Sequence, residues 1–178
     1  HIADLYSLNG LLQTQILELA FGEIIRRHEA LRTTFTMMLD EAVQVIHPAD
    51  PIRLPIIDLS QLSEPEREAT GAEIIREEAA RHFDLTSGPL LRPMLVRLSE
   101  RRHWLSIVTH HIVSDGWSVG VLIRELGQLY TAFKRGESDP LPELPMQYAD
   151  YAAWQRGCLR GNELEHHVGF WRQRLAGV

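Results

Sequence analysis

The spacing of apolar residues along the first quarter of the chain predicts a strand, a helix and a hairpin. Residues 2–8 form an apolar run typical of a strand, and across residues 13–28 apolar side chains recur every three or four positions, as on an amphipathic helix. Residues 32–38 and 42–46 are two runs of strand-forming residues separated by a turn at residues 40–41. We therefore expect a hairpin to follow the first helix.

The middle of the chain carries clearer signals. Ser63 precedes a proline and two acidic residues, so its hydroxyl is a candidate cap for a helix over residues 63–82. Residues 90–98 and 104–109 are apolar runs joined by a short polar turn, which predicts two antiparallel neighbours in one sheet. Residues 119–134 then place seven apolar side chains on one stripe, which is typical of a helix packed on a core.

The last forty residues continue the helical pattern after a break. Three prolines within residues 137–145 predict a loop, and residues 148–160 and 170–175 predict two more helices. Without internal repeats, this succession indicates one compact α+β lobe. Because the chain begins inside a strand without a methionine and ends soon after a helix, we expect both ends to be truncated from a larger polypeptide.

Composition narrows the class of protein and its compartment. The 178 residues are 44% hydrophobic and 24% charged, as in globular domains, and the net charge of −6 with scattered cations argues against a nucleic-acid partner. The one cysteine, Cys158, excludes an internal disulfide and a multi-cysteine zinc site, which favours the cytoplasm. No apolar run approaches the roughly 20 residues that span a bilayer, so we expect no membrane association.

The chemistry is concentrated after the strand that ends near residue 109, in His110, His111, Asp115 and Gly116. Side chains alternate along a strand, so adjacent histidines on a regular strand face opposite ways, and only one of them would reach a substrate. The other would then pack inward. Gly116 would permit backbone torsions or close approaches, before the helix, that a β-carbon forbids.

A histidine near a helix amino terminus is kept neutral by the positive end of the helix dipole and can then accept a proton. The same residues also fit a buried hydrogen-bonding network without catalysis, and from the residues alone both interpretations stay open. A metal site is disfavoured, because zinc takes three or four protein ligands and adjacent strand histidines diverge.

Residues 110–118 resemble the His-His-x-x-x-Asp-Gly motif of condensation domains from nonribosomal peptide synthetases, which is shared with other acyltransferases related to chloramphenicol acetyltransferase. Three further stretches are similar to motifs of this family and occur in the family's order: residues 27–35, 83–92 and 148–156. The resemblance covers nearly the whole chain.

The resemblance implies a chloramphenicol acetyltransferase-like α+β lobe with a mainly antiparallel sheet flanked by helices. Residues 1–178 would be the amino-terminal lobe of a V-shaped domain whose site lies between two lobes. It also implies that His111 is the catalytic residue, that His110 and Gly116 support the motif, and that Asp115 fixes the loop, in part through an arginine of the missing carboxy-terminal lobe. Arg27 and Arg32 would be structural ion-pair partners.

The implied reaction joins an upstream acyl or peptidyl thioester to the amine of a downstream aminoacyl thioester. Both thioesters would be carried on phosphopantetheine arms of partner carrier domains. An adenylation domain is expected to lie next to these carriers, and this lobe itself would bind no cofactor. Heterocyclising relatives have aspartate in place of the histidine pair, and epimerising relatives have a tryptophan after the serine, whereas Trp117 precedes Ser118 here. Peptide-bond formation is therefore favoured over cyclisation and epimerisation. Two alternatives remain: ester formation by a related acyltransferase, which the other motifs and residues 148–154 disfavour, and an inactive carrier-docking module.

Overall fold

The computed structural model describes all 178 residues and divides into two compact units, His1–Glu143 and Leu144–Val178. The assignment of residues 1–178 to one lobe of a larger domain stays a prediction. The second unit consists of α4 (Tyr148–Cys158) and α5 (Gly161–Arg174), and neither helix contains a buried residue. The apolar patterns predicted α4 nearly in full but only the last turn and a half of α5, whose predicted start at residue 170 is nine residues too late. A pattern also does not show whether the apolar face is covered. No helix of either unit combines the length and the apolar character needed to cross a membrane.

The first unit is built on a four-stranded sheet in the order β1 (Ile2–Asn9), β6 (Arg102–Thr109), β5 (Leu91–Ser99) and β4 (Ile56–Asp58). The β1–β6 and β5–β6 pairs are antiparallel, and the latter is the pair predicted from the sequence. Only β4 runs parallel to its neighbour, β5. Three residues carry too little periodicity to identify this strand, so the sequence pattern does not predict it.

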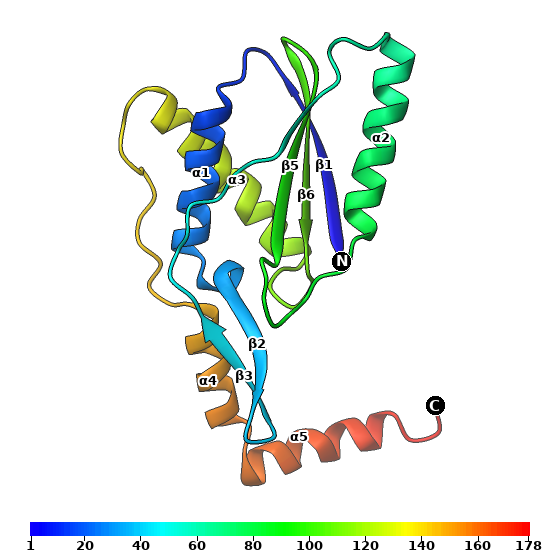
Figure 1. The fold of residues 1–178 in the computed structure, drawn as a ribbon. Coiled ribbons are helices and arrows are strands. Elements are labelled where there is room, and N and C mark those ends of the chain that lie inside the picture. Colours follow the sequence, from blue (N-terminus) through cyan, green and yellow to red (C-terminus); the bar gives the residue numbers. More distant parts are fainter. The chain divides into compact units, whose positions relative to one another are not determined.

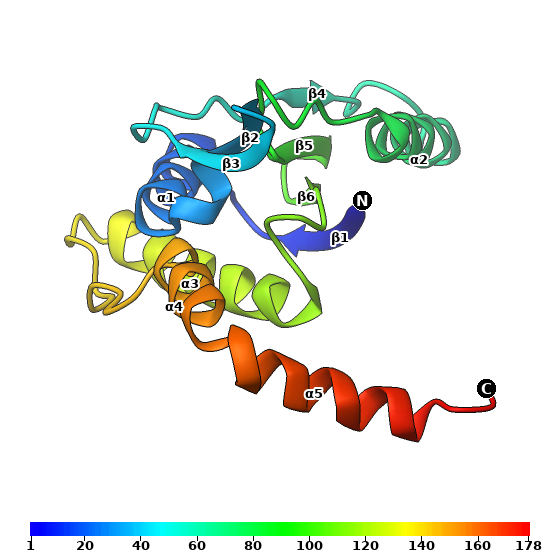
Figure 2. The ribbon, with the colours of Figure 1, turned by 90° about the horizontal axis from the view of Figure 1, so that it is seen from below.

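Helices cover both faces of this sheet, as Figures 1 and 2 show. On one face, α1 (Thr14–Arg27) and α3 (Gly116–Lys134) pack against each other and share the larger core with Leu95 of β5. On the other face, α2 (Glu64–Ala80) packs on a smaller core that includes Val96. Successive residues of β5 point to opposite faces, so this strand is buried almost throughout.

A two-stranded hairpin of β2 (Thr33–Met38) and β3 (Glu41–Ile46) follows α1 and a single 3-10 turn. Its tight turn lies at Leu39 and Asp40, one residue earlier than predicted. Both turn residues have positive φ, 50° and 63°. Two such left-handed residues form a turn whose twist matches that of the two strands, which explains why the hairpin turns at this position.

Local chemistry explains where α2 begins. The Glu66 carboxylate accepts hydrogen bonds from the Ser63 backbone N–H at 3.2 Å and from the Ser63 hydroxyl at 2.5 Å, so the predicted start at Ser63 is confirmed. The helix ends at Ala80, two residues before the predicted end.

Candidate active site

The histidine pair lies beyond the end of β6 rather than within it. The strand ends at Thr109, the His110 N–H donates to the Leu90 carbonyl at 3.0 Å, and the Val113 N–H donates to the His110 carbonyl at 3.1 Å. Residues 111–113 therefore form a turn. Side-chain alternation does not apply to a turn, so the expectation that it separates the two rings is wrong, and the surroundings of each ring decide the matter instead.

The His110 ring is half-buried and hydrogen-bonded. Its Nδ1 lies 3.1 Å from the Ile112 backbone nitrogen, whose N–H can only donate, so Nδ1 must be unprotonated and the ring proton lies on Nε2. The ring also packs against the rings of Phe83 and His1 at centroid distances of 5.8 and 5.9 Å. Burial, with a smaller effect of the neighbouring His111, lowers the pKa of His110. This imidazole is thus neutral and engaged in holding the turn.

The His111 side chain is in the opposite situation. It lies on the exposed side of the turn, and its ring makes no hydrogen bond within the chain. An imidazole with both nitrogens available can exchange a proton, or form a hydrogen bond, with a molecule that approaches from outside. Of the two histidines, His111 is the one whose ring is open to solvent.

Asp115 joins this turn to α3. It is the N-cap of the helix: its carboxylate accepts hydrogen bonds from the Ser118 backbone N–H at 2.8 Å and from the Ser118 hydroxyl at 2.6 Å. These bonds, with a smaller effect of the nearby His111, lower the pKa of Asp115. The cap starts α3 at Gly116, three residues before the predicted start, and Asp115 forms no ion pair within this chain.

The expectation for Gly116 is contradicted. Its φ is not in the left-handed region, and a β-carbon built at this position would meet no atom within 4 Å. Gly116 is the first residue of a regular helix, where other residues fit equally well. Nothing within this chain therefore requires glycine at this position.

Arg27 lies in a buried ion-pair network between α1, α3 and the proline-rich loop. Its Nε is 3.6 Å from Glu125, its Nη1 is 3.2 Å from Asp139, and its Nη2 donates to the Pro142 carbonyl at 2.7 Å. His28 approaches the same Glu125 carboxylate at 2.8 Å. None of these contacts involves the histidine turn, so Arg27 acts here as a structural residue.

Arg32 is less enclosed. It pairs with Glu29 at 3.1 Å, one helical turn away, and donates to the backbone carbonyl of His47. The guanidinium thereby ties the start of β2 to the end of β3. The two arginines suggested as structural partners thus differ in burial and in the number of bonds they make.

Two residues that support the turn, Phe83 and Arg92, carry no signal of that role in the sequence. Phe83 packs against the His110 ring, and the Arg92 guanidinium carbon lies 3.7 Å from the Phe83 ring centroid. Both belong to the stretch that resembles a family motif, but that resemblance assigned them no role. Because 27 residues separate Phe83 from His110, no local spacing rule links them.

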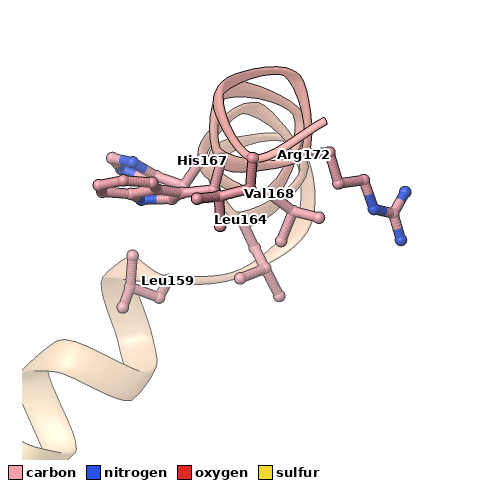
Figure 3. Close-up of a pocket in the computed structure, with 7 residues that line it drawn as sticks. Leu159, Leu164, His167, Val168 and Arg172 are labelled. Carbon is pink, nitrogen blue, oxygen red and sulfur yellow. The ribbon is translucent and has the colours of Figure 1, made fainter. Parts of the chain in front are cut away.

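The second unit carries an open apolar groove of about 740 Å³ along α5. Figure 3 shows Leu159, at the end of α4, below Leu164 and Val168 of α5, while the Arg172 guanidinium points away from them. Its lining includes one histidine, His167, and no nucleophile or carboxylate. The groove therefore lacks the groups for acyl transfer.

The comparison with protein families shows which family the chain belongs to. The family model described as "Condensation domain" matches residues 3–178 of the chain. The chain belongs to the condensation domain family. This condensation domain segment therefore carries the histidine motif of its family in an exposed turn at the end of a central strand.

Curated relatives of this condensation domain segment are much longer synthetases. It is 48% identical over 172 residues to chondramide synthase cmdD of Chondromyces crocatus, covering 97% of this chain and 4% of the relative. It is 42% identical over 167 residues to phosphinothricin tripeptide synthetase PhsC of Streptomyces viridochromogenes, covering 93% of this chain and 15% of that relative. The chain thus spans only a small part of the length of these proteins.

Solved structures show the same fold for this condensation domain segment. The X-domain from teicoplanin biosynthesis matches with a TM-score of 0.88 and 33% identity, over 99% of this chain and 39% of that one. The starter condensation domain of rhizomide synthetase RzmA matches with a TM-score of 0.88 at 19% identity, over 99% of this chain and 42% of that one. At that identity the likeness concerns the fold alone. The expected α+β fold, with a mainly antiparallel sheet flanked by helices, is confirmed.

Proposed function

We propose that this condensation domain forms peptide bonds in nonribosomal peptide synthesis and that His111 is its catalytic residue. The observation that carries the proposal is the exposed His111 imidazole, which makes no hydrogen bond within the chain and stands on a turn that is held at both ends. His110 closes the turn toward β6, and Asp115 caps the helix that follows it. A relative named as a tripeptide synthetase supports the same reaction class.

The reaction needs positioning more than activation. The amine nitrogen attacks the thioester carbon, the carbon–sulfur bond breaks, and the nitrogen proton is lost while the departing sulfur gains one. An α-amino group has a pKa of about 8, so part of it is already neutral at pH 7. Holding both reactants in place can supply roughly 7–11 kcal/mol of the barrier.

His111 has two candidate tasks within this reaction. As a general base, its neutral ring takes the proton from the nitrogen as the tetrahedral intermediate forms. As a positioning group, it donates a hydrogen bond to that intermediate. A His111→Gln variant separates them, because glutamine can donate a hydrogen bond but cannot take the proton.

The partners follow from the same proposal. The two thioesters arrive on phosphopantetheine arms of an upstream and a downstream carrier domain, so no cofactor is held by this chain itself. We propose that residues 1–178 are the amino-terminal lobe. The chain covers about two fifths of the matched condensation domain structure, which supports a single lobe, and its motifs resemble those of the amino-terminal lobe in this family. In this proposal, a carboxy-terminal lobe completes the cleft and supplies an arginine that pairs with Asp115. An adenylation domain of the same cytoplasmic synthetase loads the acceptor carrier.

The test uses the complete condensation domain with donor- and acceptor-loaded carrier proteins and detects the dipeptidyl carrier by mass spectrometry. We expect His111→Ala to lower turnover by about 10²–10⁴-fold, the usual worth of positioned acid–base catalysis. His110→Ala should lower both turnover and the melting temperature, since it removes the hydrogen bond to Ile112. The 178-residue chain alone should give no product. Near-normal turnover by the His111→Ala variant would remove His111 from its catalytic role.

A docking function without chemistry is the second candidate. The X-domain of teicoplanin biosynthesis, 34% identical over 99% of this chain with a TM-score of 0.87, was solved in a complex with OxyB. A relative of this fold therefore binds another protein. If docking were the sole function here, the wild-type domain would bind loaded carriers without releasing a dipeptidyl product.

A further inference from the structure

Phe83 lies where the histidine turn meets the segment that follows α2. Its ring is half-buried, and it meets the His110 ring edge-on, with centroids 5.8 Å apart and an interplanar angle of 82°. This is a favoured geometry for two aromatic rings, and it also covers part of the imidazole from solvent. A residue far from His110 in sequence thus forms one wall of its environment.

Arg92 holds Phe83 in this place. Its buried guanidinium stacks 3.7 Å from the Phe83 ring centroid and pairs with Glu78 at 2.5 Å. It also donates to the carbonyls of Glu78, Arg81 and His82 at distances of 3.0, 2.8 and 3.2 Å. The planar group is therefore fixed by the carboxy-terminal end of α2 and cannot swing away from the ring.

The backbone completes a rigid frame around the turn. Arg92 lies on β5 opposite Val108 of β6, only two residues before His110. The carbonyl of Leu90, the residue just before β5, accepts a hydrogen bond from the His110 N–H at 3.0 Å. Phe83, Arg92 and the His110 backbone are thus held by two adjacent buried strands and by the end of one helix.

We propose that Phe83 is a positioning residue for the turn that carries His111, and that Arg92 keeps Phe83 in contact with the His110 ring. The inference rests on the proposed role of His111. The Phe83 ring holds the His110 ring in the orientation in which Nδ1 accepts the Ile112 N–H, and that bond shapes the turn. When the contact is lost, His111 leaves its productive position.

The mechanism predicts a change in pH dependence. A protonated Nδ1 cannot accept the Ile112 N–H, so the turn requires a neutral His110, and burial lowers the pKa of His110 in this sense. Removing the ring of Phe83 exposes the imidazole, which raises this pKa toward its ordinary value. The other ionisable groups around His110 are His1, His111, and Arg92 behind Phe83, and none of them is substituted. The His1 ring also packs against Phe83, with centroids 4.9 Å apart.

The experiment compares Phe83→Leu, which removes the ring, with Phe83→Tyr, which keeps it. The matched control is Phe133→Leu, because Phe133 is also half-buried but lies at the opposite end of α3 from the turn. Turnover and KM for the donor carrier are measured in the complete domain from about pH 5 to 8, the range in which histidine titrates. ¹⁵N NMR of labelled histidine reports the His110 tautomer and titration in the same proteins.

We expect Phe83→Leu to lower kcat by up to about 10²-fold, the scale of a misplaced catalytic group, with KM unchanged. The acid limb of its pH–rate profile should move to higher pH, and the single His110 tautomer should be lost. Phe83→Tyr should behave as wild type, and Phe133→Leu should show neither change. Arg92→Lys, which loses the planar stack and several carbonyl bonds, should move the acid limb in the same direction as Phe83→Leu.

Two results would overturn the inference. One is a Phe83→Leu variant with the wild-type acid limb and tautomer, and the other is an equal loss of kcat in Phe83→Leu and Phe133→Leu. Failure of the proposed function has a different signature, namely an inactive wild type or a fully active His111→Ala variant. The NMR measurement needs no turnover, so it tests the positioning contact in either case.

Discussion

Replacing Arg27 by methionine tests whether the ion-pair network behind α1 stabilises the fold. The Arg27 side chain is 2% exposed, and its removal leaves the partly enclosed carboxylates of Glu125 and Asp139 without their guanidinium partner. The Pro142 carbonyl also loses a donor. Methionine keeps most of the aliphatic volume, so the change isolates the charge and the hydrogen bonds.

The magnitude follows from burial. Breaking a buried ion pair from one side costs about 3–5 kcal/mol, because the remaining charge stays in a poorly solvated site. His28 still approaches Glu125 at 2.8 Å, and Asp139 is 21% exposed, so the lower end of that range applies. We therefore expect a loss of about 3 kcal/mol, a large part of the typical 5–15 kcal/mol stability of a domain.

The assay is urea unfolding of this chain, followed by circular dichroism, with Arg32→Met as the matched control. Arg32 pairs with Glu29 across a partly exposed i,i+3 spacing, so its loss should cost only about 1 kcal/mol. With slopes of about 1–3 kcal/mol per molar urea, Arg27→Met should lower the midpoint by about 1 M or more. A loss no larger for Arg27→Met than for Arg32→Met would refute the reasoning from burial.

Two further changes test the turns. Leu39→Asn with Asp40→Gly should raise the melting temperature in calorimetry. Leu39 has a φ of 50°, which costs a residue such as leucine roughly 1–2 kcal/mol, whereas Asp40 at 63° costs less because aspartate tolerates this region. An unchanged midpoint would contradict this turn geometry. Asp115→Asn should preserve the start of α3 better than Asp115→Ala, since asparagine also caps helices. Hydrogen bonds from Ser118 lower the pKa of Asp115 in the folded state. The stabilisation by the charged cap is therefore complete above pH 3.8 and is lost as the pH falls through the lower folded-state pKa. The helix content of the domain, measured against pH, follows this loss.

Patterns along the chain were sufficient for most elements of the first unit. The period of the apolar residues identified α1 and α3, and the apolar runs on either side of a polar turn identified the β5–β6 pair. These signals are strong because each of these elements buries a face on the core, and burial requires apolar residues at the matching period. The short β4 has no room for such a period.

The histidine motif could be found by sequence because its residues are contiguous and resemble a family motif. The environment of each histidine ring could not be predicted from the sequence. The strand ends one residue before His110. A backbone hydrogen bond to Leu90 and a bond from the Ile112 N–H to the His110 ring, rather than strand alternation, separate the half-buried His110 from the exposed His111. The same limit applies to Gly116, whose surroundings depend on what packs near it and not on its own type.

The sequence by itself determined most of the elements, the acyltransferase motif and the family, since these depend on residues that are close along the chain. Only the tertiary structure decided which charges meet and which rings touch. Arg27 reaches Glu125 and Phe83 reaches His110 across separations of 98 and 27 residues. Such contacts are set by how α1, α3 and the sheet pack together, because packing brings distant side chains within reach and no local periodicity encodes that distance.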